Sequence, residues 1–156
     1  MKRIKLTQGK WAIVDNEDYE KLNKWKWCYY GGYAIRTIRT GVSKRTKCRM
    51  HWEVIGKPKD GFEVDHINGN GLDNKRSNLR ICTHRENTMN AKRHKDGKSG
   101  FKGVSWQKRV KKWQAQINIG GIRTSLGYFI TVKEAAQIYN EAAKKYFKDF
   151  ARLNKL

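Results

Sequence analysis

The chain has 156 residues, which is enough for one medium-sized domain or two small ones. Lysine and arginine total 35 against 14 aspartate and glutamate residues, for a formal net charge of +21, and 38% of the residues are hydrophobic. No run approaches the ~20 apolar residues of a membrane span, and residues 1–7 lack the apolar core of a signal peptide. Composition therefore argues against a membrane-bound or exported protein and predicts a cytoplasmic one.

Positive charge extends along the whole chain. Residues 1–90 carry 19 basic and 10 acidic residues, and residues 91–156 carry 16 and 4. Together with six tryptophans and seven tyrosines, this excess suits a polyanionic partner, because each phosphate contact releases bound counterions. A merely solubilising or ribosome-associated basic surface is the alternative that composition leaves open. The three cysteines form no Cys-x-x-Cys pair, which disfavours a zinc ribbon and a disulfide framework.

Residues 1–46 read as a small β-rich segment. A hairpin is expected over residues 4–14, then a short helix capped by Asp15, then two strands on either side of Gly31-Gly32. The alternating aromatic residues near this turn are expected to form the core of a small antiparallel sheet, with base stacking as the alternative. One edge of that sheet would face phosphate through its basic residues, namely Arg36, Arg39, Lys44, Arg45 and Lys47.

Residues 47–91 contain the most informative pattern of the chain. After a short helix near residues 49–55, an apolar run ends in Asp65-His66, and a loop rich in Gly, Asn and Asp follows. A second run, residues 78–82, leads to Thr83 and Glu86, which have the spacing of a capping box at the start of a helix. The pattern predicts a strand, a long turn, a strand and a helix that bring His66, Asn78 and Asn87 together.

This unit resembles the HNH nucleases, in the phage- and intron-encoded branch where asparagine replaces the final histidine. The resemblance implies a ββα-metal unit in which Asp65 and Asn87 bind a single Mg²⁺ or Mn²⁺ ion, without zinc. It also implies that His66 is the general base and that Asn78 braces the loop. Because adjacent strand residues point to opposite faces, we expect Asp65 and His66 at the end of the strand, where it bends into the loop. The alternative is a turn-rich structural loop with an exposed histidine.

A basic, glycine-bearing linker is expected over residues 92–100, followed by a second domain over residues 101–156. Three short strands are predicted over residues 103–106, 113–119 and 123–129. A helix capped by Thr131 follows, and its apolar stripe would pack on the sheet. Strand alternation turns Ala115, Ile117 and Ile119 toward this helix.

This block resembles the ethylene-response-factor (APETALA-two) DNA-binding domain in Phe101-Lys102-Gly103-Val104, residues 113–117, residues 126–129 and residues 134–139. That family binds the DNA major groove with its sheet. The resemblance therefore implies that the outward side chains read DNA, and Gln, Asn and Arg suit base edges. These DNA-binding candidates are Lys102, Ser105, Gln107, Gln114, Gln116, Asn118, Arg123 and Ser125. For Trp106 and Trp113, core packing and DNA contact both remain open.

Together these patterns predict an α+β chain, with a ββα-metal nuclease unit between a small antiparallel sheet and a three-stranded sheet packed on one helix. The expected function is metal-dependent, site-preferring cleavage of double-stranded DNA by a homing-endonuclease-like monomer, although a dimer is not excluded. A non-catalytic DNA-binding regulator is the alternative, and a basic RNA-binding module is the third interpretation. The sequence leaves open the target, the number of strands cut and the roles of His51, His84 and Asn90.

Overall fold

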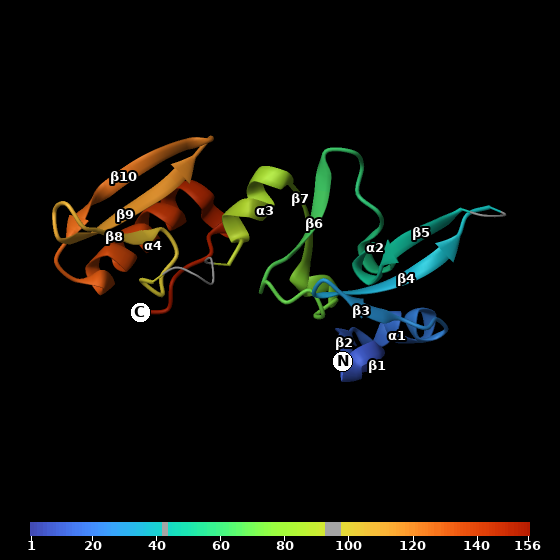
Figure 1. Ribbon diagram of the computed structural model, residues 1–156. Coiled ribbons are helices and arrows are strands. Elements are labelled where there is room, and N and C mark those ends of the chain that lie inside the picture. The colour runs from blue at the N-terminus through green and yellow to red at the C-terminus, as the bar shows by residue number, and fades with distance from the viewer. Residues whose placement is uncertain (42–43, 93–97) are drawn as a thin grey trace. The chain divides into compact units, whose positions relative to one another are not determined.

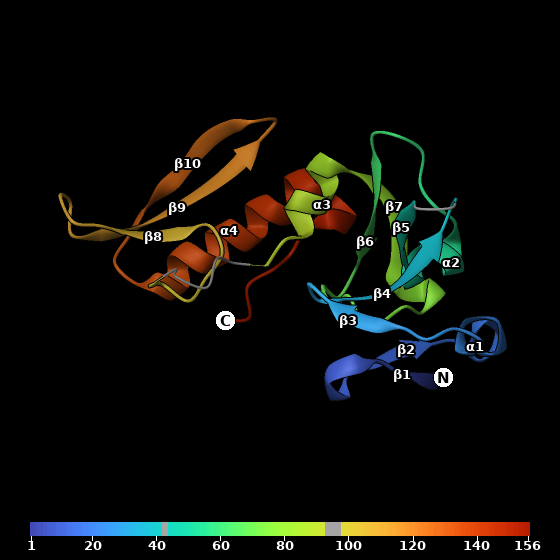
Figure 2. The ribbon, with the colours of Figure 1, turned by 45° about the vertical axis from the view of Figure 1, so that its right-hand side comes forward.

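The computed structural model describes residues 1–41, 44–92 and 98–156, and it divides into two compact units, Met1–Asn87 and Thr88–Leu156. Both are mixed α/β units built on small antiparallel sheets, with four α-helices among the described residues (Figures 1 and 2). The predicted linker, residues 92–100, lies largely outside the described residues. The division between the units falls instead inside helix α3, which spans His84–Asn90.

The N-terminal unit contains three antiparallel sheets, with strand orders β1-β2, β3-β4-β5 and β6-β7. The strand β5 was not predicted, and it turns the expected strand pair into a three-stranded sheet. The elements in chain order are β1 (Lys2–Lys5), β2 (Trp11–Val14), α1 (Asn16–Asn23), β3 (Cys28–Tyr30), β4 (Tyr33–Arg39), β5 (Arg45–Arg49), α2 (Met50–Ile55), β6 (Phe62–His66), β7 (Leu79–Thr83) and α3.

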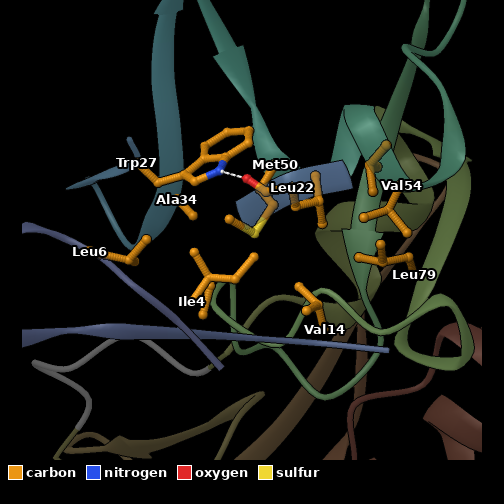
Figure 3. Close-up of a cluster of buried hydrophobic side chains, with 11 residues drawn as sticks. Ile4, Leu6, Val14, Leu22, Trp27, Ala34, Met50, Val54 and Leu79 are labelled. Atoms are coloured by element: carbon orange, nitrogen blue, oxygen red, sulfur yellow. Dashed lines mark hydrogen bonds between the residues drawn. The ribbon is translucent and has the colours of Figure 1, made fainter. Parts of the chain in front are cut away.

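One hydrophobic core joins all these elements except β5 and α3 (Figure 3). Ile4 and Trp27 from the N-terminal segment pack in the same cluster as Met50 and as Val64 and Leu79 of the β6–β7 hairpin. The buried indole N–H of Trp27 donates to the carbonyl oxygen of Leu22 at 2.9 Å. This hydrogen bond satisfies the polar atom of the large aromatic ring inside the core. Residues 1–46 and the strand–loop–strand segment are therefore stabilised together.

Side-chain alternation on the β3-β4-β5 sheet differs from the expectation at Arg36. This arginine was expected at a phosphate-facing edge, but it is half-buried and pairs with Glu53 of α2 at 2.8 Å. Its guanidinium carbon also lies 4.2 Å from the ring centroid of Trp25, which is 49% exposed. Of the alternating aromatics, Trp27 is therefore the core residue, and Trp25 is a surface stacking partner.

The C-terminal unit is a three-stranded antiparallel sheet of order β10-β9-β8 packed on one long helix. Ala115 and Ile117 are buried and Ile119 packs at the edge of this core, as the alternation of the strand predicts. Thr131 and Glu134 form a reciprocal capping box at the start of the helix. The elements are β8 (Val104–Gln107), β9 (Lys112–Ile119), β10 (Ile122–Phe129) and α4 (Val132–Phe147).

In the described part of the chain, no helix has both the length and the apolar character needed to cross a membrane.

Candidate functional site

The β6–β7 hairpin positions the predicted site residues on two faces. Pairing is regular up to the last residue of β6, with Asp65 opposite Arg80 and His66 opposite Leu79. Strand alternation therefore turns Glu63 and Asp65 to one face and His66 to the other, which is the core face that Val64 and Leu79 share. Asp65 and His66 do stand at the end of the strand, but the strand does not bend before them.

Asn78 fastens the loop that follows β6. Its side-chain oxygen accepts a hydrogen bond from the backbone N–H of Asn68 at 3.0 Å. Its amide nitrogen donates to the carbonyl oxygen of Asp73 at 2.7 Å and to the side-chain oxygen of Asn68 at 3.2 Å. Because Asn78 is 7% exposed, these three bonds are shielded from water and hold two points of the loop close to the start of β7.

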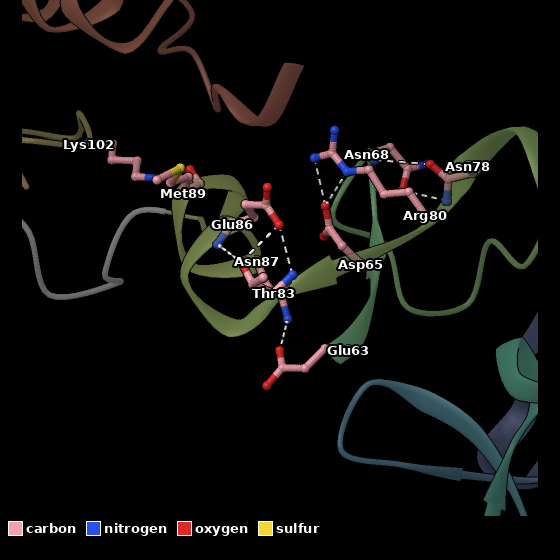
Figure 4. Close-up of polar contacts among 10 residues, drawn as sticks. All are labelled: Glu63, Asp65, Asn68, Asn78, Arg80, Thr83, Glu86, Asn87, Met89 and Lys102. Atoms are coloured by element: carbon pink, nitrogen blue, oxygen red, sulfur yellow. Dashed lines mark hydrogen bonds and ion pairs between the residues drawn. The ribbon is translucent and has the colours of Figure 1, made fainter. Parts of the chain in front are cut away.

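Asp65 is buried, with 4% exposure, and its carboxylate pairs with the guanidinium of Arg80 (Figure 4). Nε and one terminal nitrogen of Arg80 both donate to the same oxygen, Oδ2, at 2.9 and 2.7 Å. A buried carboxylate needs such a partner to remain ionised. Arg80 therefore fixes the orientation of the Asp65 carboxylate.

Glu63 links the strand to helix α3. The amide nitrogen of Asn87 donates to one oxygen of Glu63, and Nδ1 of His84 lies 2.9 Å from the other. These hydrogen bonds, first that of Asn87 and then that of His84, lower the pKa of Glu63. Because the nitrogen of the Asn87 side chain points at Glu63, its oxygen is the atom that a cation could use (Figure 4).

The start of α3 is fixed by the predicted capping box. The backbone N–H of Thr83 donates to the Glu86 carboxylate at 2.8 Å, and the backbone N–H of Glu86 reaches the Thr83 hydroxyl at 3.3 Å. This reciprocal pair sets where the helix begins. It thereby places Asn87 one turn into α3, on the side of Glu63.

His66 is buried in the N-terminal unit, among polar and aromatic side chains. Its Nε2 is 3.3 Å from Oδ1 of Asn74, and its ring centroid is 5.0 Å from that of His51. Burial lowers the pKa of His66, although Asn74 and the nearby Asp65 and Asp73 oppose the shift. Neutral imidazole is therefore favoured at neutral pH, as a proton acceptor requires.

His51, whose role the sequence left open, is a buried neighbour of His66. Burial, followed by the electrostatic effects of His66 and Arg49, lowers the pKa of His51 to about 3. Its imidazole is therefore neutral at neutral pH, and its edge packs against the rings of Tyr33 and His66. His51 is therefore a neutral ring that packs against the His66 imidazole.

The donor atoms on the Asp65 face fit a hard divalent cation. Glu63 and Asp65 leave the same face of β6, and Asn87 of α3 is bonded to Glu63. All three side chains offer oxygen donors of the kind that Mg²⁺ and Mn²⁺ prefer. A separate acidic group, Asp15-Glu17-Asp18, brings three carboxylates within 4.8 Å of one another. Arg76 binds all three of these residues, so this group is part of a surface ion-pair network.

In the C-terminal unit, seven of the eight predicted DNA-binding residues lie on the sheet face opposite α4. A chain of side-chain hydrogen bonds crosses this face, from Gln107 to Gln114 at 2.9 Å and from Gln114 to Ser125 at 3.1 Å. Asn118 accepts from the backbone N–H of Gly121, so it also closes the β9–β10 turn. The seven residues are Ser105, Gln107, Gln114, Gln116, Asn118, Arg123 and Ser125.

Lys102 is placed differently. It precedes β8, and its ammonium group donates to the carbonyl oxygens of Met89 and Ala91 at 2.6 and 2.8 Å. Burial lowers the pKa of Lys102 to about 8. The side chain therefore joins two segments of the C-terminal unit, the end of α3 and the residues before β8. Trp113 packs in the core of this unit, whereas Trp106, which stacks edge-on against it at 5.1 Å, is 44% exposed.

Sequence reasoning missed four residues that shape these sites. Glu63 stands two residues before Asp65 and so shares its face, which strand alternation could have shown. Arg80 and Asn74 become partners of Asp65 and His66 only through strand register and the fold of the loop. Tyr128 lies opposite Gln114 in the sheet and is 50% exposed on the face of the DNA-binding candidates.

Comparison with known proteins places this geometry in context. The family model for HNH endonuclease matches residues 51–89. A protein of Acanthamoeba polyphaga mimivirus named as an uncharacterized HNH endonuclease is 31% identical over 151 residues, which cover 96% of this chain and 77% of that protein. Protein 3.8 of Escherichia phage T7 is 38% identical over 71 residues, which cover 45% of this chain and 59% of that protein. No solved structure matches the chain.

Proposed function

Since this chain belongs to the HNH endonuclease family, we propose that it is a divalent-metal-dependent DNA endonuclease that hydrolyses phosphodiester bonds at preferred sites, in the manner of homing endonucleases. One observation carries the proposal. The carboxylate of Asp65 is held by Arg80 on the face of β6 where Glu63 holds Asn87 of α3. The oxygen donors proposed for the metal thus belong to one face of β6 and to α3, and the buried imidazole of His66 stands at the end of the same strand on its other face.

In this proposal Asp65 and Asn87 hold one Mg²⁺ or Mn²⁺ ion, with Glu63 orienting the amide of Asn87. A bound ion of this kind supplies stabilisation for the negative charge that builds on the phosphate during hydrolysis. His66 is neutral at neutral pH and takes the proton of the attacking water. Asn78 holds the loop, and with it the end of β6 where His66 stands.

The C-terminal unit is proposed to select the DNA site. Its sheet offers glutamine, asparagine and arginine side chains on a face away from α4, and such side chains pair with base edges in the major groove. The matched family segment, residues 51–89, does not include this unit. Its role as an ethylene-response-factor-like DNA-binding domain therefore rests on the quoted sequence resemblance and on the face that these residues share.

The first test is cleavage of supercoiled plasmid by purified wild type and His66→Ala, with Mg²⁺, with Mn²⁺ and with EDTA. We expect relaxed or linear product only for wild type with metal, and the ratio of the two products reports whether one or both strands are cut. Asn70→Ala, an exposed change in the same loop, is the matched control and should keep activity. DNA binding by both proteins without cleavage in any metal would favour the non-catalytic regulator.

A further inference from the structure

The β4–β5 hairpin of the N-terminal unit carries its charges on one face. The register pairs Thr37 with Lys47, Arg39 with Arg45 and Ile35 with Arg49, so the side chains of these three pairs leave the same side of the hairpin. Arg39, Arg45, Lys47 and Arg49 are all exposed. We call these four side chains the hairpin stripe.

The opposite face of the hairpin is committed to the interior of the unit. Ala34, Cys48 and Met50 are buried there, and Arg36 is neutralised by Glu53. Within the described part of the chain the four stripe side chains form no ion pair, and residues 33–49 contain no aspartate or glutamate. Lys47 stacks over the ring of Tyr30 at 4.2 Å, an interaction that orders its stem while leaving its charge exposed. Exposed cations without acidic partners are the signature of a polyanion-binding surface.

The stripe leads toward the proposed cleavage site. Arg49 lies against Tyr33 and Trp52, with its guanidinium 5.4 Å from each ring centroid. Tyr33 in turn lies beside His66, with the centroids of the two rings 5.8 Å apart. From Arg49 to Arg45 the strand extends for about 13 Å, which is the axial length of about four base pairs of duplex. In Figure 1, β4 and β5 extend outward from the rest of the N-terminal unit.

We propose that the hairpin stripe is a second DNA-contact surface, which grips the phosphate backbone of the duplex on one side of the bond that is cut. The inference rests on the proposed endonuclease function, because the duplex bound by the stripe is the one presented to Asp65 and His66. The stripe contributes affinity without reading sequence, since its members are charged groups that address phosphates. Sequence preference is left to the C-terminal sheet.

The test measures binding without catalysis. A fluorescein-labelled 30-base-pair duplex of mixed sequence is titrated in EDTA over a series of salt concentrations with wild type and with a triple variant, Arg39→Ala, Arg45→Ala and Lys47→Ala. We expect the variant to bind roughly tenfold or more weakly, and the slope of log K against log salt to fall by about 2 to 3. The matched control removes three exposed cations of the same unit outside the hairpin, Lys5→Ala, Lys24→Ala and Lys26→Ala, and should lower the slope by less than about 1.

A second variant tests the stripe by a gain of binding, which an unfolded protein would not show. Thr37→Lys adds one cation to the same face at an exposed position, and we expect tighter binding with a slope steeper by about 0.9. Equal losses in the two triple variants, or no gain with Thr37→Lys, would overturn the inference. Cleavage is scored separately with Mg²⁺: stripe-dependent binding without any cleavage refutes the endonuclease alone, and cleavage with stripe-independent binding refutes the stripe alone.

Discussion

The loop between β6 and β7 depends on a single asparagine, so Asn78→Ala should open it locally. Three hydrogen bonds of the Asn78 side chain, at 3.0, 2.7 and 3.2 Å, are lost together. Each contributes about 1 kcal/mol in a shielded site, and the backbone partners lose their satisfied geometry as well. We therefore expect a loss of about 3 kcal/mol in the local opening free energy, which is a rise of roughly 150-fold in the open population.

Hydrogen exchange followed by mass spectrometry measures this quantity in the intact chain and resolves the two units. Peptides covering residues 62–83 should lose protection in Asn78→Ala, whereas peptides of α4 in the C-terminal unit should be unchanged. The matched control is Asn70→Ala in the same loop, where an exposed side-chain oxygen accepts one bond from the backbone N–H of Leu72 at 3.2 Å. That change should cost less than about 1 kcal/mol.

Metal-dependent cleavage is measured on the same two variants. If His66 needs a fixed loop, Asn78→Ala loses activity in step with its loss of protection, while Asn70→Ala does not. Equal protection in Asn78→Ala and wild type would refute the reasoning, because it would mean that the loop is held without these three bonds.

Two further predictions test the packing of each unit. Gly103 has φ +73°, and an added Cβ would overlap ring atoms of Tyr139 and the carbonyl oxygen of Gln116. Gly103→Ala should therefore destabilise the C-terminal unit by about 3 kcal/mol in urea unfolding. Gly100→Ala has a similar φ of +77° but no atom within 4 Å, so it should cost only about 1 kcal/mol, and equal losses would contradict the steric argument. Burial opposes the ionisation of Glu53, but hydrogen bonds from Arg36 and Cys48 outweigh it and lower the pKa of this carboxyl below its usual 4.5. The pair therefore contributes stability above about pH 4.5 that is lost as the pH falls through the folded pKa, so urea midpoints should decline between pH 5 and 3 less steeply for Glu53→Gln than for wild type; identical declines would contradict the assignment.

Local signals predicted the secondary structure well where short-range chemistry decides it. Thr83 with Glu86 and Thr131 with Glu134 marked the starts of two helices, and both capping boxes are present. The alternation of residues 113–119 correctly gave the buried face of β9. These features depend on residues within one or two turns of each other, which is the range that a sequence pattern describes.

Contacts between distant residues could not be predicted in the same way. Arg36 was expected to face phosphate, but the register of β4 places it on the other face of the sheet, where it pairs with Glu53, 17 residues later. Arg80 lies opposite Asp65 only because of the register of β6 and β7. Lys102 contacts Met89, which lies 13 residues earlier in the sequence. In each case the two partners are distant in the sequence, so their contact depends on the three-dimensional fold.

The backbone hydrogen bonds of β2 set a lower limit on the length of a functional fragment of this chain. The backbone N–H of Ile13 donates to the carbonyl oxygen of Leu72 at 2.8 Å, and the N–H of Asn74 returns a bond of 2.8 Å to Ile13. The side chain of Asn74 contacts the His66 imidazole. The backbone of this contact residue is therefore held by β2, which lies about sixty positions earlier in the sequence. An excised piece limited to residues 51–89 would lack both these hydrogen bonds and most of the buried hydrophobic core. Anyone grafting the cutting activity onto another DNA-reading protein would have to transplant residues 1–87 as one block.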